Sequence, residues 1–158
     1  MPSGGYYIRG GKGREAREHM NVMLDTCVII DFLQGRNPFD ADADVIMESC
    51  AREKITGCIS AKAVTDIYYI MHRYFYDDKK ARELINKLLE IVSVADTSAD
   101  DVFRALYSDV KDFEDAVLAE TALKNNMDCI ITRNLKDFDS AGIKVYSPEK
   151  FISEYIDL

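Results

Sequence analysis

Short apolar segments alternate with longer amphipathic segments from residue 20 to the end of the chain. Apolar runs bounded by polar and turn residues predict strands at residues 21–24, 55–59, 91–94, 128–132 and 143–146. Apolar residues at helical spacing predict helices at residues 26–33, 40–54, 60–74, 77–90, 98–108 and 112–125, and a last helix that Pro148 opens. Because strands separated by helices build βα units, the predicted fold class is α/β, a three-layer α/β/α sandwich with a mostly parallel central sheet.

Residues 1–19 differ in composition from the rest of the chain. They hold five of its eight glycines, and an apolar strand begins only after Met20. We expect a flexible extension at 1–19, either a tag or a mis-started segment with the true start at Met20. A nucleic-acid-binding arm is the alternative. Residues 20–158 are expected to form a single domain, because no linker or internal repeat divides them.

Length and composition limit the class of protein. A chain of 158 residues suits one domain, and 47% hydrophobic residues suffice for a core, which excludes disorder of most of the chain. The apolar runs are all far shorter than the roughly 18 residues of a membrane-spanning helix. The start of the chain lacks the apolar stretch of a secretory signal. We therefore expect a cytoplasmic protein.

Charge and residue types exclude further functions. The net charge is −8, so a broad basic surface that grips duplex DNA is not expected. The four cysteines show no paired spacing and lie in or beside apolar segments, which predicts reduced, structural thiols. With only two histidines, His19 and His72, the chain is poorly supplied for a histidine zinc site or a Ser-His-Asp triad.

Polar side chains gather where the predicted strands end. In an open parallel sheet, ligands bind outside the carboxyl ends of the strands. Asp25 follows the first strand, Thr132 and Asn134 come at the end of the fourth, and Asp137 lies three residues further on. Asp115 lies in the first turn of the helix that precedes the fourth strand. These residues are therefore expected to meet at one edge of the sheet.

Asp66 is a lone acid in an apolar helical run. Ala63 and Ile70 share its helix face, which predicts that its side chain points inward at the edge of the core. A carboxylate there is costly unless it is paired or binds a metal ion. Other acids have simpler interpretations: Asp25 and Asp112 could cap helices, and Asp137 could lie in a turn.

Converging carboxylates repel one another, and few lysines or histidines are predicted nearby. A divalent cation is the expected compensation, and oxygen ligands favour Mg²⁺ or Mn²⁺ over zinc. Such ions activate water and stabilise the charge that develops on a phosphate. The sequence therefore predicts metal-assisted phosphodiester hydrolysis without a covalent protein nucleophile.

Three stretches resemble the motifs of PIN-domain proteins, in the right order and at the right spacing. They are NVMLDTCVIIDFL, ISAKAVTDIYYI and EDAVLAETALKNNMDCIITRNLKDF. The resemblance extends from Met20 to the end of the chain and implies a ribonuclease dependent on Mg²⁺ or Mn²⁺. The chain looks most like small toxins of the VapC type, which cleave RNA, are inhibited by a cognate antitoxin and are often homodimers.

The resemblance also implies roles for individual residues. The catalytic, metal-binding acids would be Asp25, Asp66 and Asp115, with Asn134 or Asp137 completing the site. Supporting residues would be Thr26, Thr132 and Asp112, of which the threonines orient a carboxylate or water and Asp112 is an alternative ligand.

Two positions depart from the family pattern. Asp66 replaces the usual Glu, and Asn134 stands where many members have Asp. Both favour the alternative that the chain is a non-catalytic PIN-like module that binds RNA or protein. A phosphotransfer domain of the haloacid-dehalogenase or receiver type is disfavoured, because the required acidic pairs are missing.

Basic and aromatic residues near the motifs are candidates for RNA contact. Arg133 and Lys136 follow the fourth strand and could bind phosphate, although exposed basic residues are common. An aromatic cluster lies in and directly after the helix at 60–74. It consists of Tyr68, Tyr69, Tyr74, Phe75 and Tyr76. Such a cluster could stack on bases, but a core or a dimer or antitoxin interface is the favoured interpretation.

Overall fold

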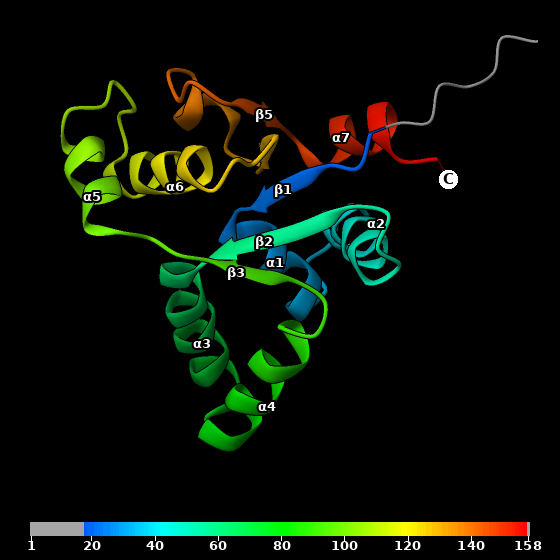
Figure 1. The fold of residues 1–158 in the computed structure, drawn as a ribbon. Helices are drawn as coiled ribbons and strands as arrows, with labels where there is room; N and C mark the ends of the chain where they lie inside the picture. Colours follow the sequence, from blue (N-terminus) through cyan, green and yellow to red (C-terminus); the bar gives the residue numbers. More distant parts are fainter. Residues whose placement is uncertain (1–17, 158) are drawn as a thin grey trace, which may run out of the picture.

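The computed structural model describes residues 18–157, with a five-stranded sheet at its centre (Figure 1). Its strands run in the order β3-β2-β1-β4-β5, and every neighbouring pair is parallel. Their bounds are β1 (Asn21–Leu24), β2 (Thr56–Ser60), β3 (Ser93–Ala95), β4 (Cys129–Ile131) and β5 (Lys144–Tyr146). The parallel α/β sheet predicted from the sequence is confirmed. The predicted extension at 1–19 lies outside the described residues, except for Glu18 and His19.

Seven α-helices and a 3₁₀ helix connect or flank the described strands (Figure 1). They are α1 (Thr26–Gln34), α2 (Asp40–Ala51), α3 (Ala61–Phe75), α4 (Asp78–Leu88), α5 (Ala99–Leu106), α6 (Phe113–Lys124), the 3₁₀ helix η1 (Leu135–Phe138) and α7 (Pro148–Tyr155). Ser60 and Asp112 are the N-caps of α3 and α6, since each side chain accepts a backbone N–H from the first turn, and for Asp112 this is the capping role named above. The N-cap of α2 is Phe39, which makes no side-chain hydrogen bond, and Asp40 and Asp42 lie in the first turn of that helix.

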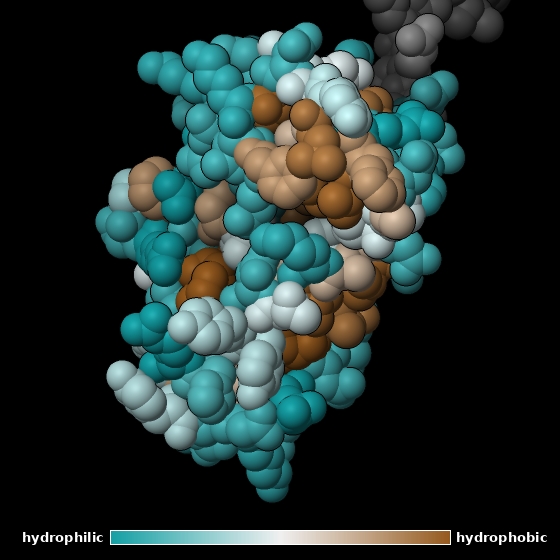
Figure 2. All heavy atoms as spheres, turned by 90° about the vertical axis from the view of Figure 1, so that its left-hand side faces the viewer, coloured by the Kyte–Doolittle hydropathy of each residue, from teal (hydrophilic) through white to brown (hydrophobic). Residues whose placement is uncertain are grey.

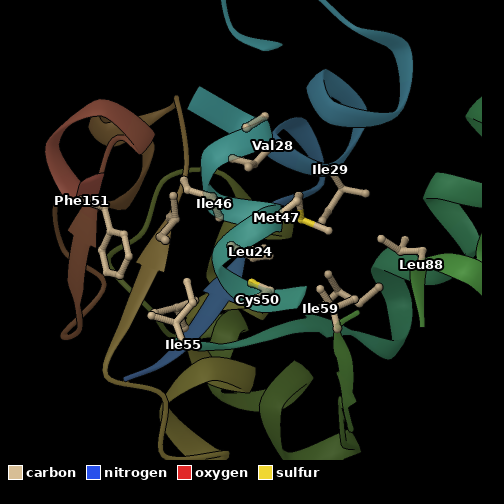
Figure 3. Close-up of a cluster of buried hydrophobic side chains, with 14 of the residues drawn as sticks. Leu24, Val28, Ile29, Ile46, Met47, Cys50, Ile55, Ile59, Leu88 and Phe151 are labelled. Carbon is tan, nitrogen blue, oxygen red and sulfur yellow. The ribbon is translucent and has the colours of Figure 1, made fainter. Parts of the chain in front are cut away.

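Side chains of the strands alternate between two cores, which is why the molecule has three layers. Val22 and Leu24 face the core under α1, α2, α3, α4 and α7, whereas Met23 faces the smaller core under α5 and α6. Figure 3 shows part of the larger core, where Ile46 and Met47 of α2 lie over Leu24 of β1. The three-layer prediction is therefore confirmed.

The third strand begins two residues later than the predicted range of 91–94 and ends one residue later. The backbone N–H groups of Ile91 and Val92 both donate to the carbonyl of Leu88, at the end of α4. These bonds extend the helix end and delay the start of β3 to Ser93. An apolar pair after a helix can thus complete the helix terminus instead of starting a strand.

Gly57 allows α2 to pack closely on β2. A Cβ at this position would lie 2.6 Å from Cys50 Sγ, closer than real Cβ atoms come to their neighbours, and 3.2 Å from Leu24 Cδ1, a tight contact. We expect Gly57→Ala to lower the free energy of unfolding by about 1–3 kcal/mol, measured by urea denaturation. The control is Cys50→Ala, which should cost less in the Gly57→Ala background than alone. Equal costs in both backgrounds would contradict the proposed steric conflict.

Two further predictions concern the cysteines and the membrane. All four cysteines are free thiols, and Cys50, Cys58 and Cys129 are buried, as expected from their apolar surroundings. No helix between residues 18 and 157 is long and apolar enough to span a membrane.

Candidate active site

Asp25 lies at the carboxyl end of β1, between the ends of β2 and β4. It is the N-cap of α1, since its Oδ1 accepts the Thr26 N–H at 2.8 Å. Its other oxygen accepts the Thr132 hydroxyl at 2.7 Å. Asp25 is therefore both a helix cap and a fixed carboxylate at the sheet edge. The hydrogen bond from Thr132 is the contact that the role implied for it, to orient a carboxylate, requires, and that role stays a prediction.

Asp115 reaches the same pocket from the first turn of α6. Its backbone N–H donates to Asp112 Oδ1 at 3.0 Å, so Asp112 acts as the cap of this helix. The pocket is small, and its polar lining consists of Asp25, Thr26, Ser60, Lys62, Asp66, Glu114 and Asp115. The predicted convergence of Asp25, Asp66 and Asp115 is therefore found, together with Glu114 and Lys62, which the sequence reasoning missed.

The pocket disfavours the charged form of its carboxyl groups. Burial raises the pKa of Asp25 above its ordinary value, although hydrogen bonds from Thr132 and Thr26 act in the opposite direction. The pKa of Asp115 is raised to about 7, first by burial and then by the negative charges of Asp25, Asp112, Asp137 and Glu114. A group of carboxylates that raise one another's pKa favours the binding of a cation.

Asp66 faces the pocket but differs in part from its prediction. Its side chain lines the pocket beside Ala63 but is 37% exposed, so the predicted inward position at the edge of the core is only partly reached. Its Oδ2 is 2.7 Å from the ammonium of Lys62, one helical turn earlier. Lys62 is the one lysine of the pocket lining, which agrees with the expectation of few lysines nearby.

Lys62 also binds a second acid. Its Nζ lies 3.0 Å from Glu114 Oε1, so the ammonium connects α3 to the first turn of α6. Within residues 18–157, no three His, Cys, Asp or Glu side chains are arranged to hold one metal ion. Two of the four carboxylates of the lining, those of Asp66 and Glu114, are paired with Lys62.

The donor chemistry of the pocket nevertheless fits a divalent ion. Asp25 and Asp115 supply hard oxygen atoms, which are the ligands that Mg²⁺ and Mn²⁺ prefer. Their mutual repulsion is a cost that a bound cation would remove, as the raised pKa of Asp115 indicates. Asp25 and Asp115 are therefore the two residues best placed to bind such an ion.

The remaining candidates lie on the segment after β4. The backbone N–H of Asn134 donates to Thr132 Oγ1 at 3.0 Å, and the side chain of Asn134 is exposed. Lys136 and Asp137 lie on η1, a helix that the sequence did not predict, and both are exposed. None of these three lines the pocket, although the charge of Asp137 contributes to the raised pKa of Asp115. Their predicted ligand and RNA-binding roles stay predictions.

Arg133 is held by a partner that the sequence did not identify. Its Nε and Nη2 donate to the two oxygens of Asp31 at 2.6 and 3.2 Å, and its guanidinium stacks on Phe39. Asp31 lies in α1 and its side chain is only 2% exposed. Arg133 therefore anchors the segment after β4 to α1, and its predicted contact with phosphate stays a prediction.

The aromatic cluster on α3 is mostly at the surface. Most of the surface of Tyr69, Tyr74 and Tyr76 is exposed, and Phe75 is about one third exposed. A role in the core is therefore wrong for these four, because the helix turns them away from the sheet. Only Tyr68 is half-buried, where it stacks on His72 and hydrogen-bonds to Asp78.

The crowded carboxylates have a cost in stability that can be measured. In EDTA at pH 8, we expect Asp115→Asn to raise the melting temperature by about 2–4 °C, because it removes a charge that burial and four neighbouring acids oppose. The backbone bond to Asp112 is kept in this variant. The control is Asp109→Asn, an exposed residue outside the pocket lining, which should leave the melting temperature unchanged. A lower melting temperature for Asp115→Asn would contradict this account.

Comparison with protein families gives one match. The family model described as "PIN domain" matches residues 21–136, which include Asp25, Asp66, Asp115 and Asn134. A search of curated proteins found no match.

Solved structures of similar fold include toxins from several bacteria. VapBC2 from Rickettsia felis, bound to a DNA fragment from its promoter, is 14% identical with a TM-score of 0.60 over 81% of this chain and 98% of that one. A toxin-antitoxin complex from Klebsiella pneumoniae is 24% identical with a TM-score of 0.60, over 80% of this chain and 97% of that one. VapC20 from Mycobacterium tuberculosis, a toxin that cleaves the sarcin-ricin loop, is 14% identical with a TM-score of 0.59, over 78% and 98%. These likenesses show a shared fold.

Proposed function

This chain belongs to the PIN-domain family, and from that premise we propose that it is a metal-dependent endoribonuclease, the toxin of a toxin-antitoxin pair. The observation that carries the proposal is the convergence of Asp25 and Asp115 in one pocket at the carboxyl edge of the sheet. Two carboxylates that repel each other at a ligand-binding edge lower the stability of the fold unless they bind a ligand that offsets the repulsion. The ligand proposed here is a divalent cation that takes part in phosphate chemistry.

The residues of the pocket have separate parts in the proposed reaction. Asp25 and Asp115 would hold Mg²⁺ or Mn²⁺, with Asn134 and Asp137 as further proposed ligands; Asp66 would join them only when it is released from its ion pair with Lys62. The bound ion would supply water activation and stabilise the negative charge that develops on the scissile phosphate. The Thr132 hydroxyl donates a 2.7 Å hydrogen bond to one oxygen of Asp25, which fixes the orientation of that carboxylate toward the ion.

Partners are also part of the proposal. The solved relatives include complexes of toxins with antitoxins, which supports a cognate antitoxin for this chain. Figure 2 shows the face that carries α3, α5 and α6, where apolar side chains gather at the surface. Phe103, Leu106 and Tyr107 of α5 and its C-cap are among these exposed residues. We propose that such apolar surface is covered by an antitoxin or by a second copy of the chain in a homodimer. With RNA as the substrate, we place the protein in the cytoplasm.

The test is cleavage of RNA by the purified chain. Cleavage is expected with Mn²⁺ or Mg²⁺, and it should stop with EDTA and in Asp25→Asn. Cleavage that continues in EDTA would refute the metal-dependent mechanism. Absence of cleavage at every metal concentration, together with RNA binding, would favour the non-catalytic module, which the pairing of Asp66 with Lys62 also favours.

A further inference from the structure

Lys62 is a half-exposed cation in the lining of the acidic pocket, and the proposed function leaves it without a role. Its ammonium lies 2.7 Å from Asp66 and 3.0 Å from Glu114, which come from two different helices. Lys150, by contrast, pairs with Glu154 of its own helix at 2.8 Å. Lys62 is thus placed between two acids as a metal ion would be.

The charge of the pocket sets how many further cations it can accept. Four carboxylates line it, from Asp25, Asp66, Glu114 and Asp115, and Lys62 is the one basic residue of the lining. Lys62 and one divalent ion together carry slightly less positive charge than the four carboxylates carry negative charge. Lys62 and two divalent ions would reverse the sign of the pocket, which opposes binding of the second ion.

We propose that the Lys62 ammonium takes the place of a second metal ion between Asp66 and Glu114, so that the pocket binds a single divalent ion at Asp25 and Asp115. This inference rests on the proposed function, because it concerns the same pocket. It assigns Lys62 a positioning role: it holds two carboxylates and supplies fixed positive charge beside the ion. Because Lys62 neutralises Asp66, this carboxylate need not bind the ion.

The experiment is calorimetric titration of Mn²⁺ into the full-length chain. The wild type is expected to bind one Mn²⁺, and Lys62→Gln to bind a second Mn²⁺ or to bind the first about tenfold more tightly, because the competing charge is gone. Lys62→Arg keeps the charge and should behave like the wild type. The matched control is Lys150→Gln, which removes the same charge from a pair outside the pocket and should also behave like the wild type. Thermal melts of each variant establish that it is folded.

The outcomes separate this inference from the proposed function. One Mn²⁺ in the wild type and the same number and affinity in folded Lys62→Gln would overturn the role of Lys62, while metal binding would stand. Two Mn²⁺ in the wild type would overturn it as well. No Mn²⁺ in the wild type or in any variant would refute the proposed metal site, and the inference with it. Tighter or additional binding in Lys62→Gln alone would support it.

Discussion

Asp25→Asn is expected to reduce RNA cleavage about a thousandfold or more while the fold survives. A metal ion contributes several kcal/mol to a phosphoryl transition state, and each 1.4 kcal/mol is a factor of about ten in rate. The amide keeps an oxygen for the Thr26 N–H, so the cap of α1 is retained. The variant lacks the negative charge that holds the ion, and its NH₂ group replaces the oxygen that accepts the Thr132 hydroxyl.

The control for this variant is Asp128, which directly precedes β4 and lies beside the start of β1, at the opposite edge of the sheet from Asp25. Asp128 Oδ2 accepts the backbone N–H of Asn21 at 2.7 Å, at the start of β1. Asp128→Asn makes the same chemical change outside the pocket lining, so cleavage should be unchanged. Rates are measured on one RNA at equal Mn²⁺ concentration, with circular dichroism to compare the folds. Cleavage by Asp25→Asn at the wild-type rate would remove Asp25 from the mechanism.

Arg133→Met is expected to lower the free energy of unfolding by about 3 kcal/mol. The side chain of Asp31 is 2% exposed and that of Arg133 is 27% exposed, so loss of the guanidinium leaves a carboxylate buried without its partner. Breaking a buried pair on one side commonly costs about 3–5 kcal/mol, and partial exposure of Arg133 places the expectation at the lower end. Phe39 also loses the guanidinium that stacks on its ring.

Two further variants separate this cause from a general effect of losing an arginine. Arg104 makes an exposed pair with Asp100 at 2.9 Å, so Arg104→Met should hardly change stability. Adding Asp31→Asn to Arg133→Met should recover part of the loss, since the unpaired charge is removed. Urea denaturation measures all four proteins. Equal stabilities for Arg133→Met and Arg104→Met would show that burial of Asp31 has no energetic consequence.

The fold was largely predictable because its signals are local. Alternating apolar runs and caps such as Ser60 and Asp112 lie within one element, and they give the βα order directly. The end of β1 also identified Asp25 as a residue at the ligand-binding edge. The start of β3 was less predictable, because the bonds from Ile91 and Val92 to Leu88 depend on how α4 ends.

Parts of the site were missed for two different reasons. Lys62 stands four residues before Asp66, a spacing that favours an ion pair on a helix, so this signal was present in the sequence. The pair of Asp31 and Arg133 was not readable, because it joins residues about a hundred positions apart through the strand order. The contact of Glu114 with Lys62 likewise depends on how α6 lies beside α3.

The central claim is that Asp25 and Asp115 form a metal site for RNA cleavage. Its most direct test is a Mn²⁺ titration by calorimetry on the wild type and on Asp25→Asn, followed by an RNA cleavage assay at the saturating Mn²⁺ concentration. The account predicts that the wild type binds Mn²⁺ and cleaves, and that both properties are lost together in Asp25→Asn. Absence of Mn²⁺ binding by the wild type, or full cleavage by the variant, would contradict it.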